Sequence, residues 1–103
     1  MKLESGFAQV VFYSGARIVL EGPAELQIIS SNEASCLSGR LVAEVPPEAR
    51  GFCVRTPQMS VTDLGTSFGL EANERQTELH VFKGSVELQR STGAAKELLR
   101  EGT

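Results

Sequence analysis

Residues 16–29 read ARIVLEGPAELQII, and this stretch decides the fold class. Apolar and polar side chains alternate within Ala16–Glu21 and again within Ala24–Ile29, which is the pattern of a strand with one buried face. Gly22 and Pro23 separate the two runs. Proline donates no ladder hydrogen bond and belongs at the start or edge of a strand. We therefore predict two short strands that meet at a corner.

The same period of two continues on both sides of this stretch. Further strands are predicted at Phe7–Tyr13, Ala34–Leu37, Arg40–Val45, Phe52–Thr56, Met59–Leu64, Thr66–Ala72, Thr77–Lys83, Ser85–Ser91 and Lys96–Glu101. Good helix formers fill Ala94–Arg100, so a short helix is the alternative for the last of these. The two prolines in Pro46–Gly51 predict a surface loop with one helical turn at Glu48–Arg50.

About ten short strands without helical periodicity predict an all-β protein. We expect one domain over residues 1–103, built as a two-sheet antiparallel β-sandwich or a jelly-roll-like roll, with a β-solenoid-like roll as the alternative. The in-phase apolar positions predict the core. They are Val10, Phe12, Ile18, Leu20, Leu26, Ile28, Leu41, Val45, Phe52, Val54, Phe68, Leu79, Val81 and Val86.

Composition excludes several classes of protein. Of the 103 residues, 41% are hydrophobic and 22% charged, which is ordinary for a soluble globular domain. The formal net charge is -3 and the basic residues are scattered, so we expect no nucleic-acid partner. An apolar run of about 18 residues is missing, so this segment should not insert into a membrane. The first residues also lack the pattern of a signal peptide, and we expect the chain to be a segment of a longer protein.

Few residues in the chain could carry chemistry. One histidine and two cysteines are too few for a His/Cys zinc site. His80 is expected on the solvent side of its strand, opposite buried Leu79 and Val81. Cys36 precedes an expected inward residue, and Cys53 follows one. We therefore predict outward, unpaired thiols, with a cross-strand disulfide as the alternative. We expect no catalytic, cofactor-binding or metal-binding residues and no enzymatic activity.

The segment VTDLGTSF, residues 61–68, contains a change of parity. Val61 faces inward on odd numbering, whereas Leu64, Thr66 and Phe68 continue on even numbering. Such a change needs a bulge or a tight bend, and Gly65 has the permissive backbone for it. We predict that Gly65 has a positive φ and that Asp63 accepts a backbone hydrogen bond at the bend.

Four runs in order along the chain resemble the FecR domain: SGARIVLEGPAEL, LSGRLVAEVPPEARGFCVRTP, VTDLGTSFGLE and ELHVFKGSVELQ. The resemblance covers about Val10–Gly102. It places family-signature positions of structural character at Gly15, Gly22, Pro23, Gly39, Phe52, Thr56, Pro57, Asp63, Gly65, Thr66, Phe68 and Gly84. Ser67 departs from the acidic residue that the family pattern has between Thr66 and Phe68.

The resemblance implies a non-enzymatic sensor domain without a cofactor, on the periplasmic side of a single-pass inner-membrane protein. FecR-type regulators relay a signal from an outer-membrane transporter of the iron-uptake type to an extracytoplasmic-function sigma factor. The implied partners are therefore proteins of a membrane signalling system. The alternative is a generic extracytoplasmic β-module for carbohydrate binding or adhesion, with Phe12, Tyr13 and Phe82 as stacking rings. Partner identity, binding surface and oligomeric state stay open at this point.

Overall fold

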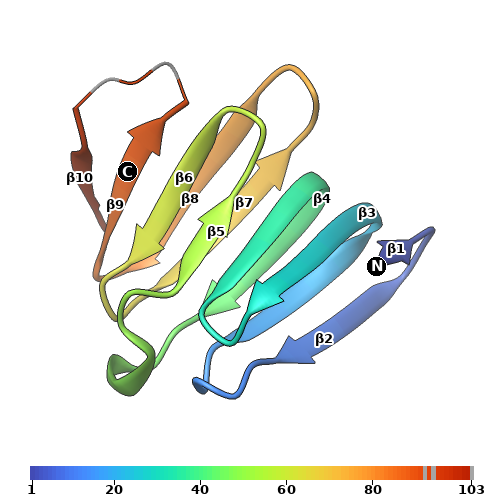
Figure 1. Cartoon of the computed structure of the whole chain (residues 1–103), viewed down its shortest axis with the longest axis horizontal. Coiled ribbons are helices and arrows are strands. Elements are labelled where there is room, and N and C mark those ends of the chain that lie inside the picture. Colours follow the sequence, from blue (N-terminus) through green and yellow to red (C-terminus); the bar gives the residue numbers. More distant parts are fainter. Residues whose placement is uncertain (92, 94, 103) are drawn as a thin grey trace.

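The computed structural model describes residues 1–91, 93 and 95–102, and these form an all-β protein (Figure 1). The elements are β1 (Lys2–Leu3), β2 (Phe7–Val11), β3 (Arg17–Ser30), β4 (Glu33–Glu44), the 3-10 turn η1 (Pro47–Ala49), β5 (Cys53–Arg55), β6 (Met59–Asp63), β7 (Ser67–Ala72), β8 (Thr77–Lys83), β9 (Ser85–Arg90) and β10 (Glu97–Arg100). The predicted all-β class is confirmed, and so is the helical turn within the proline loop. The last segment is a strand and not a helix over the described residues; Ala94 of that alternative lies outside them.

The ten strands form a single mixed sheet that doubles over into two layers (Figure 1). The first layer contains β2, the first part of β3, the second part of β4, β7 and β8. The second layer contains β1, the remaining parts of β3 and β4, β5, β6, β9 and β10. The two packed layers of a sandwich are present, and the described residues form neither a barrel nor a solenoid. The layers are joined because β3 and β4 run through both.

The strands predicted on either side of Gly22 and Pro23 are one strand, β3. The peptide bond between these residues is cis, and the pairing register with β4 shifts between Glu21 and Glu25. Strand β4 likewise continues through Gly39, which has a φ of 120°. A Cβ atom at Gly39 would lie 2.4 Å from that of Ala24 in β3. The predicted breaks are therefore bends, at which two paired strands turn together from one layer into the other.

One strand pair departs from the antiparallel prediction. Strands β4 and β5 are parallel, with Glu33 opposite Cys53 and Ser35 opposite Arg55. Parallel neighbours need a crossover connection. Here the second part of β4 and the loop with η1 provide it, by carrying the chain through the first layer and back to the second. The short strand β1, which pairs with β3, was not predicted at all.

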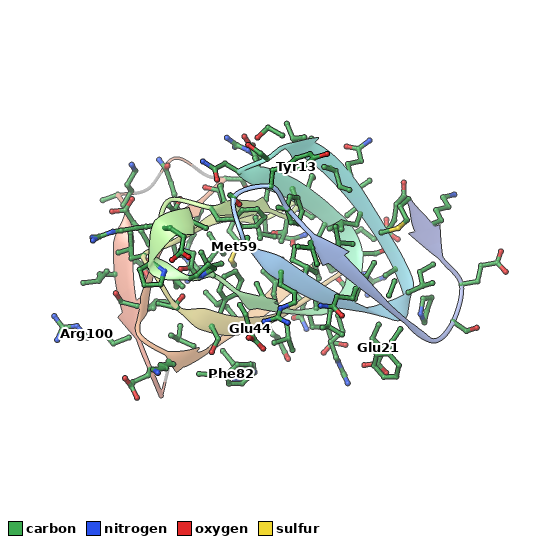
Figure 2. All side chains as sticks on the ribbon, turned by 90° about the horizontal axis from the view of Figure 1, so that it is seen from below. Tyr13, Glu21, Glu44, Met59, Phe82 and Arg100 are labelled. Atoms are coloured by element: carbon green, nitrogen blue, oxygen red, sulfur yellow. The ribbon has the colours of Figure 1, made fainter. Side chains whose placement is uncertain are left out.

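The core lies between the two layers, and Figure 2 shows its side chains filling that space. Most predicted core residues are buried, although Val10 and Leu79 are only partly so. The rings of Phe12 and Phe52 meet edge to face with 4.7 Å between their centroids. Ile28 was predicted wrongly and is 56% exposed. Residues 27–30 are exposed on both faces of β3.

The prediction for Cys36 is also wrong, since its side chain is completely buried. A register shift between β3 and β4, at which Leu37 is the extra residue in β4, places Cys36 opposite inward-facing Leu26 and turns Leu37 outward. Cys53 is half-buried, and both thiols are free. Burial raises the pKa of the Cys36 thiol to about 11 and also raises that of Cys53. Both thiols are thus protonated at neutral pH.

Candidate functional site

The bend between β6 and β7 is the most polar feature of the interior. Asp63 is completely buried at the end of β6. Its Oδ1 accepts hydrogen bonds from the backbone N–H groups of Gly65 (2.5 Å) and Thr66 (2.7 Å). Its Oδ2 accepts another from the Thr66 hydroxyl. Gly65 has a φ of 94°, so both the predicted bend and the predicted Asp63 cap are confirmed.

This bend is tied to its surroundings by backbone hydrogen bonds and by a close contact. The Val45 N–H donates to the Thr66 carbonyl and the Asp63 N–H to the Phe52 carbonyl, each at 2.8 Å. A Cβ atom at Gly84, where φ is 81°, would lie 2.3 Å from Thr66 Cγ2. With Thr66 in place, position 84 therefore has no room for a side chain.

Burial raises the pKa of Asp63, while the hydrogen bonds from Thr66 and Gly65 oppose this shift. The carboxylate faces its own turn, where it accepts hydrogen bonds from Gly65 and Thr66. Its oxygens are already occupied as acceptors. The carboxylate therefore acts as a structural cap, which stabilises the bend where the chain passes from one layer to the other.

The structure distributes the family-signature positions over both ends of the molecule. Asp63, Gly65, Thr66 and Gly84 meet at the β6–β7 bend, whereas Gly22, Pro23 and Gly39 lie at the bends of β3 and β4. Phe52 and Phe68 are completely buried. Gly15 closes a turn by donating to the Phe12 carbonyl at 2.9 Å.

Thr56 caps the turn that begins with Pro57, between β5 and β6. Its hydroxyl accepts the N–H groups of Gln58 (3.3 Å) and Met59 (3.2 Å). The Thr77 hydroxyl lies 2.8 Å from Thr56 Oγ1. Because Thr56 follows β5 and Thr77 begins β8, this contact links the two layers at the end opposite Asp63.

The outward surface of the first layer has a regular pattern of side chains, and we call it the outer face. The strand register places one outward residue from each of β2, β3, β4, β7 and β8 side by side in each of three rows. The middle row contains Gln9, Val19, Val42, Gly69 and His80. Val19 and Val42 are 40% and 38% exposed, so the centre of the outer face is apolar.

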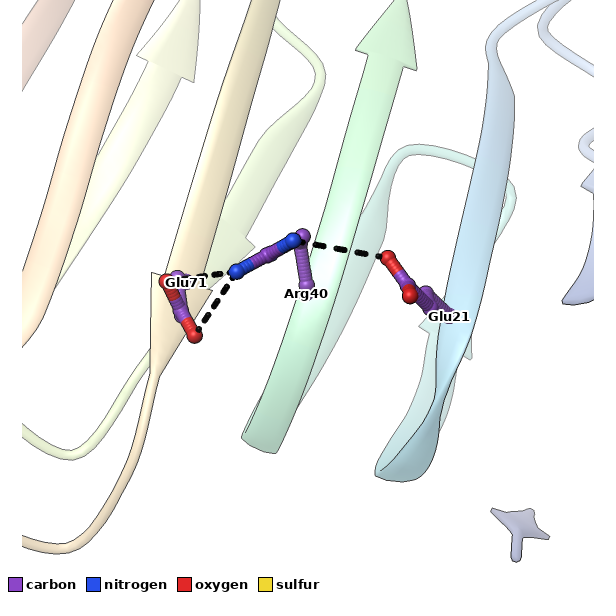
Figure 3. Close-up of polar contacts among 3 residues, drawn as sticks. All are labelled: Glu21, Arg40 and Glu71. Atoms are coloured by element: carbon purple, nitrogen blue, oxygen red, sulfur yellow. Dashed lines mark hydrogen bonds and ion pairs between the residues drawn. The ribbon is translucent and has the colours of Figure 1, made fainter. Parts of the chain in front are cut away.

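The rows on either side are charged and differ in sign. The row we call acidic contains Phe7, Glu21, Arg40, Glu71 and Glu78. Within it, Arg40 lies 3.7 Å from a Glu21 oxygen and 3.4 Å from both Glu71 oxygens (Figure 3). The row we call basic contains Val11, Arg17, Glu44, Ser67 and Lys83. Arg17 and Glu44 pair there at 3.5 Å.

Phe82 adds an aromatic ring to this face. A β-bulge opposite Ser67 leaves both Phe82 and Lys83 exposed. The Phe82 ring lies over Gly69, since a Cβ atom there would be 2.9 Å from Phe82 Cζ. Arg40, Val42, His80 and Phe82 border a shallow hollow of about 330 Å³. Figure 2 shows Glu21, Glu44 and Phe82 along the same side of the molecule.

The remaining features considered in the sequence analysis are His80, metal ligands and membrane spans. His80 is exposed next to buried Val81, as predicted. Within residues 1–91, 93 and 95–102, no group of three or more His, Cys, Asp and Glu residues is placed to hold a metal ion. None of the helices in this same part of the chain is long and apolar enough to cross a membrane. The sequence did not reveal the outer face, because its rows depend on strand register.

The fold and the outer face define a compact β-domain. The apolar centre and charged rows of its outer face suit a contact with a protein. Residues 3–87 match the family described as FecR protein. The chain therefore belongs to the FecR family, which is a family of regulators, as the four sequence runs predicted.

Two crystal structures of a candidate anti-sigma factor from Parabacteroides distasonis have the same fold, at 1.65 and 2.50 Å resolution. Each superposes with a TM-score of 0.81 at 21% sequence identity and covers 98% of this chain. The chain spans 50% of the length of that protein. No curated protein matches the sequence.

Proposed function

We propose that this chain is the extracytoplasmic regulatory domain of a FecR-type transmembrane regulator. In this role it relays a signal from an outer-membrane transporter to an extracytoplasmic-function sigma factor. The domain acts in the periplasm by binding other proteins and catalyses no reaction. The single observation that carries the proposal is the FecR family match over residues 3–87.

The surface chemistry supports a protein partner. The outer face combines exposed valines and a phenylalanine with rows of ion pairs, and such a mixture of apolar centre and charged margin is typical of protein interfaces. The buried polar cluster at Asp63 is fully occupied by its own turn, which leaves it without a free group for chemistry on a substrate.

The carbohydrate-binding alternative has weaker support. Phe12, one of its three candidate rings, is buried against Phe52. Tyr13 and Phe82 are exposed, but Figure 2 shows them on opposite sides of the molecule. Two rings so placed cannot stack on one sugar.

A binding experiment tests the proposal. The periplasmic signalling domains of the TonB-dependent transporters encoded in the same genome are titrated into this domain by isothermal calorimetry. We expect one of them to bind with saturable heat, and a glycan array to remain blank. Absence of binding to every such domain, together with specific glycan binding, would overturn the proposal in favour of the carbohydrate module.

A further inference from the structure

The pattern of the outer face leads to an inference beyond the proposed function. We propose that two copies of this chain associate through their outer faces, around a two-fold axis that runs along the middle row. The occupant of the outer face is thus a second copy of the chain. The register of five strands and the sign of the charges in the two flanking rows support this contact.

The geometry of a two-fold face-to-face contact follows from the register. The acidic and basic rows each lie two residues from the middle row on β2, β3, β4 and β7, which is about 7 Å on a strand. A two-fold axis along the middle row therefore places the acidic row of one copy over the basic row of the other. Each strand then crosses its own equivalent, as in aligned packing of two sheets.

The two rows are complementary, strand by strand. On β3, Glu21 of one copy faces Arg17 of the other, and on β4, Arg40 faces Glu44. On β3 the acidic row carries the negative charge and the basic row the positive one, whereas on β4 the two signs are exchanged. Opposite charges face each other across the contact on both strands.

The outer strands of the layer follow the same rule. On β8, Glu78 faces Lys83, and on β2, apolar Phe7 faces apolar Val11. Only β7, where Glu71 faces Ser67, contributes no charge or apolar pair. Four of the five strands therefore contribute a complementary pair.

The centre of the contact is apolar. Val42 lies on β4, the middle strand of the layer, so the axis brings the two Val42 side chains together with Val19 beside them. Stable interfaces use about 20–30 residues from each partner. Three rows on five strands supply fewer, so the dimer should be weak, with a dissociation constant of about 10 µM to 1 mM.

Glu78 and Lys83 provide the sharpest test. Among the described residues, neither has an ion-pair partner, so reversing the charge of either breaks no ion pair within the copy. Lys83→Glu places two carboxylates face to face in the dimer, and Glu78→Lys places two ammonium groups face to face. In a mixture of the two variants, however, both facing pairs have opposite charges.

Sedimentation velocity between about 10 µM and 1 mM protein measures the association. We expect the unaltered chain to shift from monomer toward dimer and each single variant to associate about tenfold more weakly. The equimolar mixture should regain association. Glu87→Lys and Lys96→Glu are the controls, because this ion pair (3.4 Å) joins β9 to the residue before β10, in the second layer and away from the outer face. Both controls should associate like the unaltered chain.

Three results would overturn the proposal. They are a chain that stays monomeric over the whole range, a dimer that both single variants leave unchanged, or a mixture that associates no better than either variant alone. A monomeric chain would assign the outer face to a different protein, and it would leave the proposed regulatory function standing.

Discussion

The Asp63 carboxylate accepts a hydrogen bond from the Thr66 hydroxyl at the point where the chain passes from one layer to the other. Strand β6, which ends at Asp63, belongs to the second layer, whereas β7 begins after Thr66 in the first. Gly65 lies between them with a positive φ. The pair therefore fixes the direction in which the chain turns from β6 into β7. This bend covers the core at this end of the molecule.

Replacing Asp63 with alanine should destabilise the domain by about 3 kcal/mol or more. The substitution leaves three donors without their acceptor, and a buried unsatisfied group costs about 1–3 kcal/mol. Asp63→Asn is the matched control. Its amide oxygen still accepts the two N–H groups and its NH₂ donates to the Thr66 oxygen, so the expected loss is about 1 kcal/mol or less. Urea unfolding measures both, and equal losses would contradict the capping role.

The pH dependence of stability should carry the signature of Asp63. Its pKa is raised in the folded protein, so the folded state holds the proton more tightly than the unfolded state does. The stability from this group is fully present below the unfolded pKa of about 3.9, and it is lost as pH rises through the folded pKa.

Asp63→Asn lacks this titration. The free energy of unfolding of the unaltered chain minus that of the variant should therefore fall as pH rises through this window, and stay constant above it. Urea unfolding of both proteins between about pH 3 and pH 7 gives this difference. A difference that increases with pH would show that hydrogen bonding outweighs burial and lowers the pKa.

Gly84→Ala should destabilise the domain more than Gly51→Ala does. Both glycines have a positive φ, at 81° and 98°, so each substitution carries a backbone cost of about 1 kcal/mol. Only at Gly84 does the new methyl group meet an atom, Thr66 Cγ2 at 2.3 Å, and overpacking adds about 1–3 kcal/mol. Thr66→Ser removes that atom and should recover part of the loss in the double variant. Equal unfolding midpoints for the two single variants would show that the contact relaxes freely.

Local patterns predicted much of the fold, because alternation and turn chemistry act over a few residues. The strands of the first layer, the buried partners Phe12 and Phe52 and the bend at Gly65 all follow from such patterns. The strand break predicted at Gly22 and Pro23 is wrong. Strand β3 continues through the bend because it stays paired with β4 on both sides of it.

Residues whose side depends on distant pairing could not be placed. A register shift turns Cys36 inward, and the end of β3 leaves Ile28 uncovered. The parallel pairing of β4 with β5 and the charge rows of the outer face have the same origin. Each depends on which strands become neighbours, and that information does not lie within any single strand.

Cys36 should react with alkylating reagents far more slowly than an exposed thiol. It is completely buried, its Sγ donates to the Ser38 carbonyl at 3.4 Å, and its pKa is about 11. The thiolate is the reactive form, so at about pH 8 the rate should be reduced about a hundredfold. Mass spectrometry after iodoacetamide treatment should find both cysteines labelled in urea and Cys36 unlabelled in the native protein. Rapid native labelling, absent in Cys36→Ser, would show that this strand opens readily.

The claim that this domain regulates a sigma factor is tested most directly in its host. In cells with the full-length regulator, a reporter gene under the sigma factor of the proposed system is measured with and without the substrate of the proposed transporter. Deleting residues 3–87, the part that matches the FecR family, should abolish the response of the reporter to that substrate, because the proposed function assigns reception of the signal to this domain. Replacing Glu48, an exposed residue on η1, with glutamine is the matched control and should leave the response intact. A regulator without residues 3–87 that is still made at normal levels and still responds fully to the substrate would contradict the account.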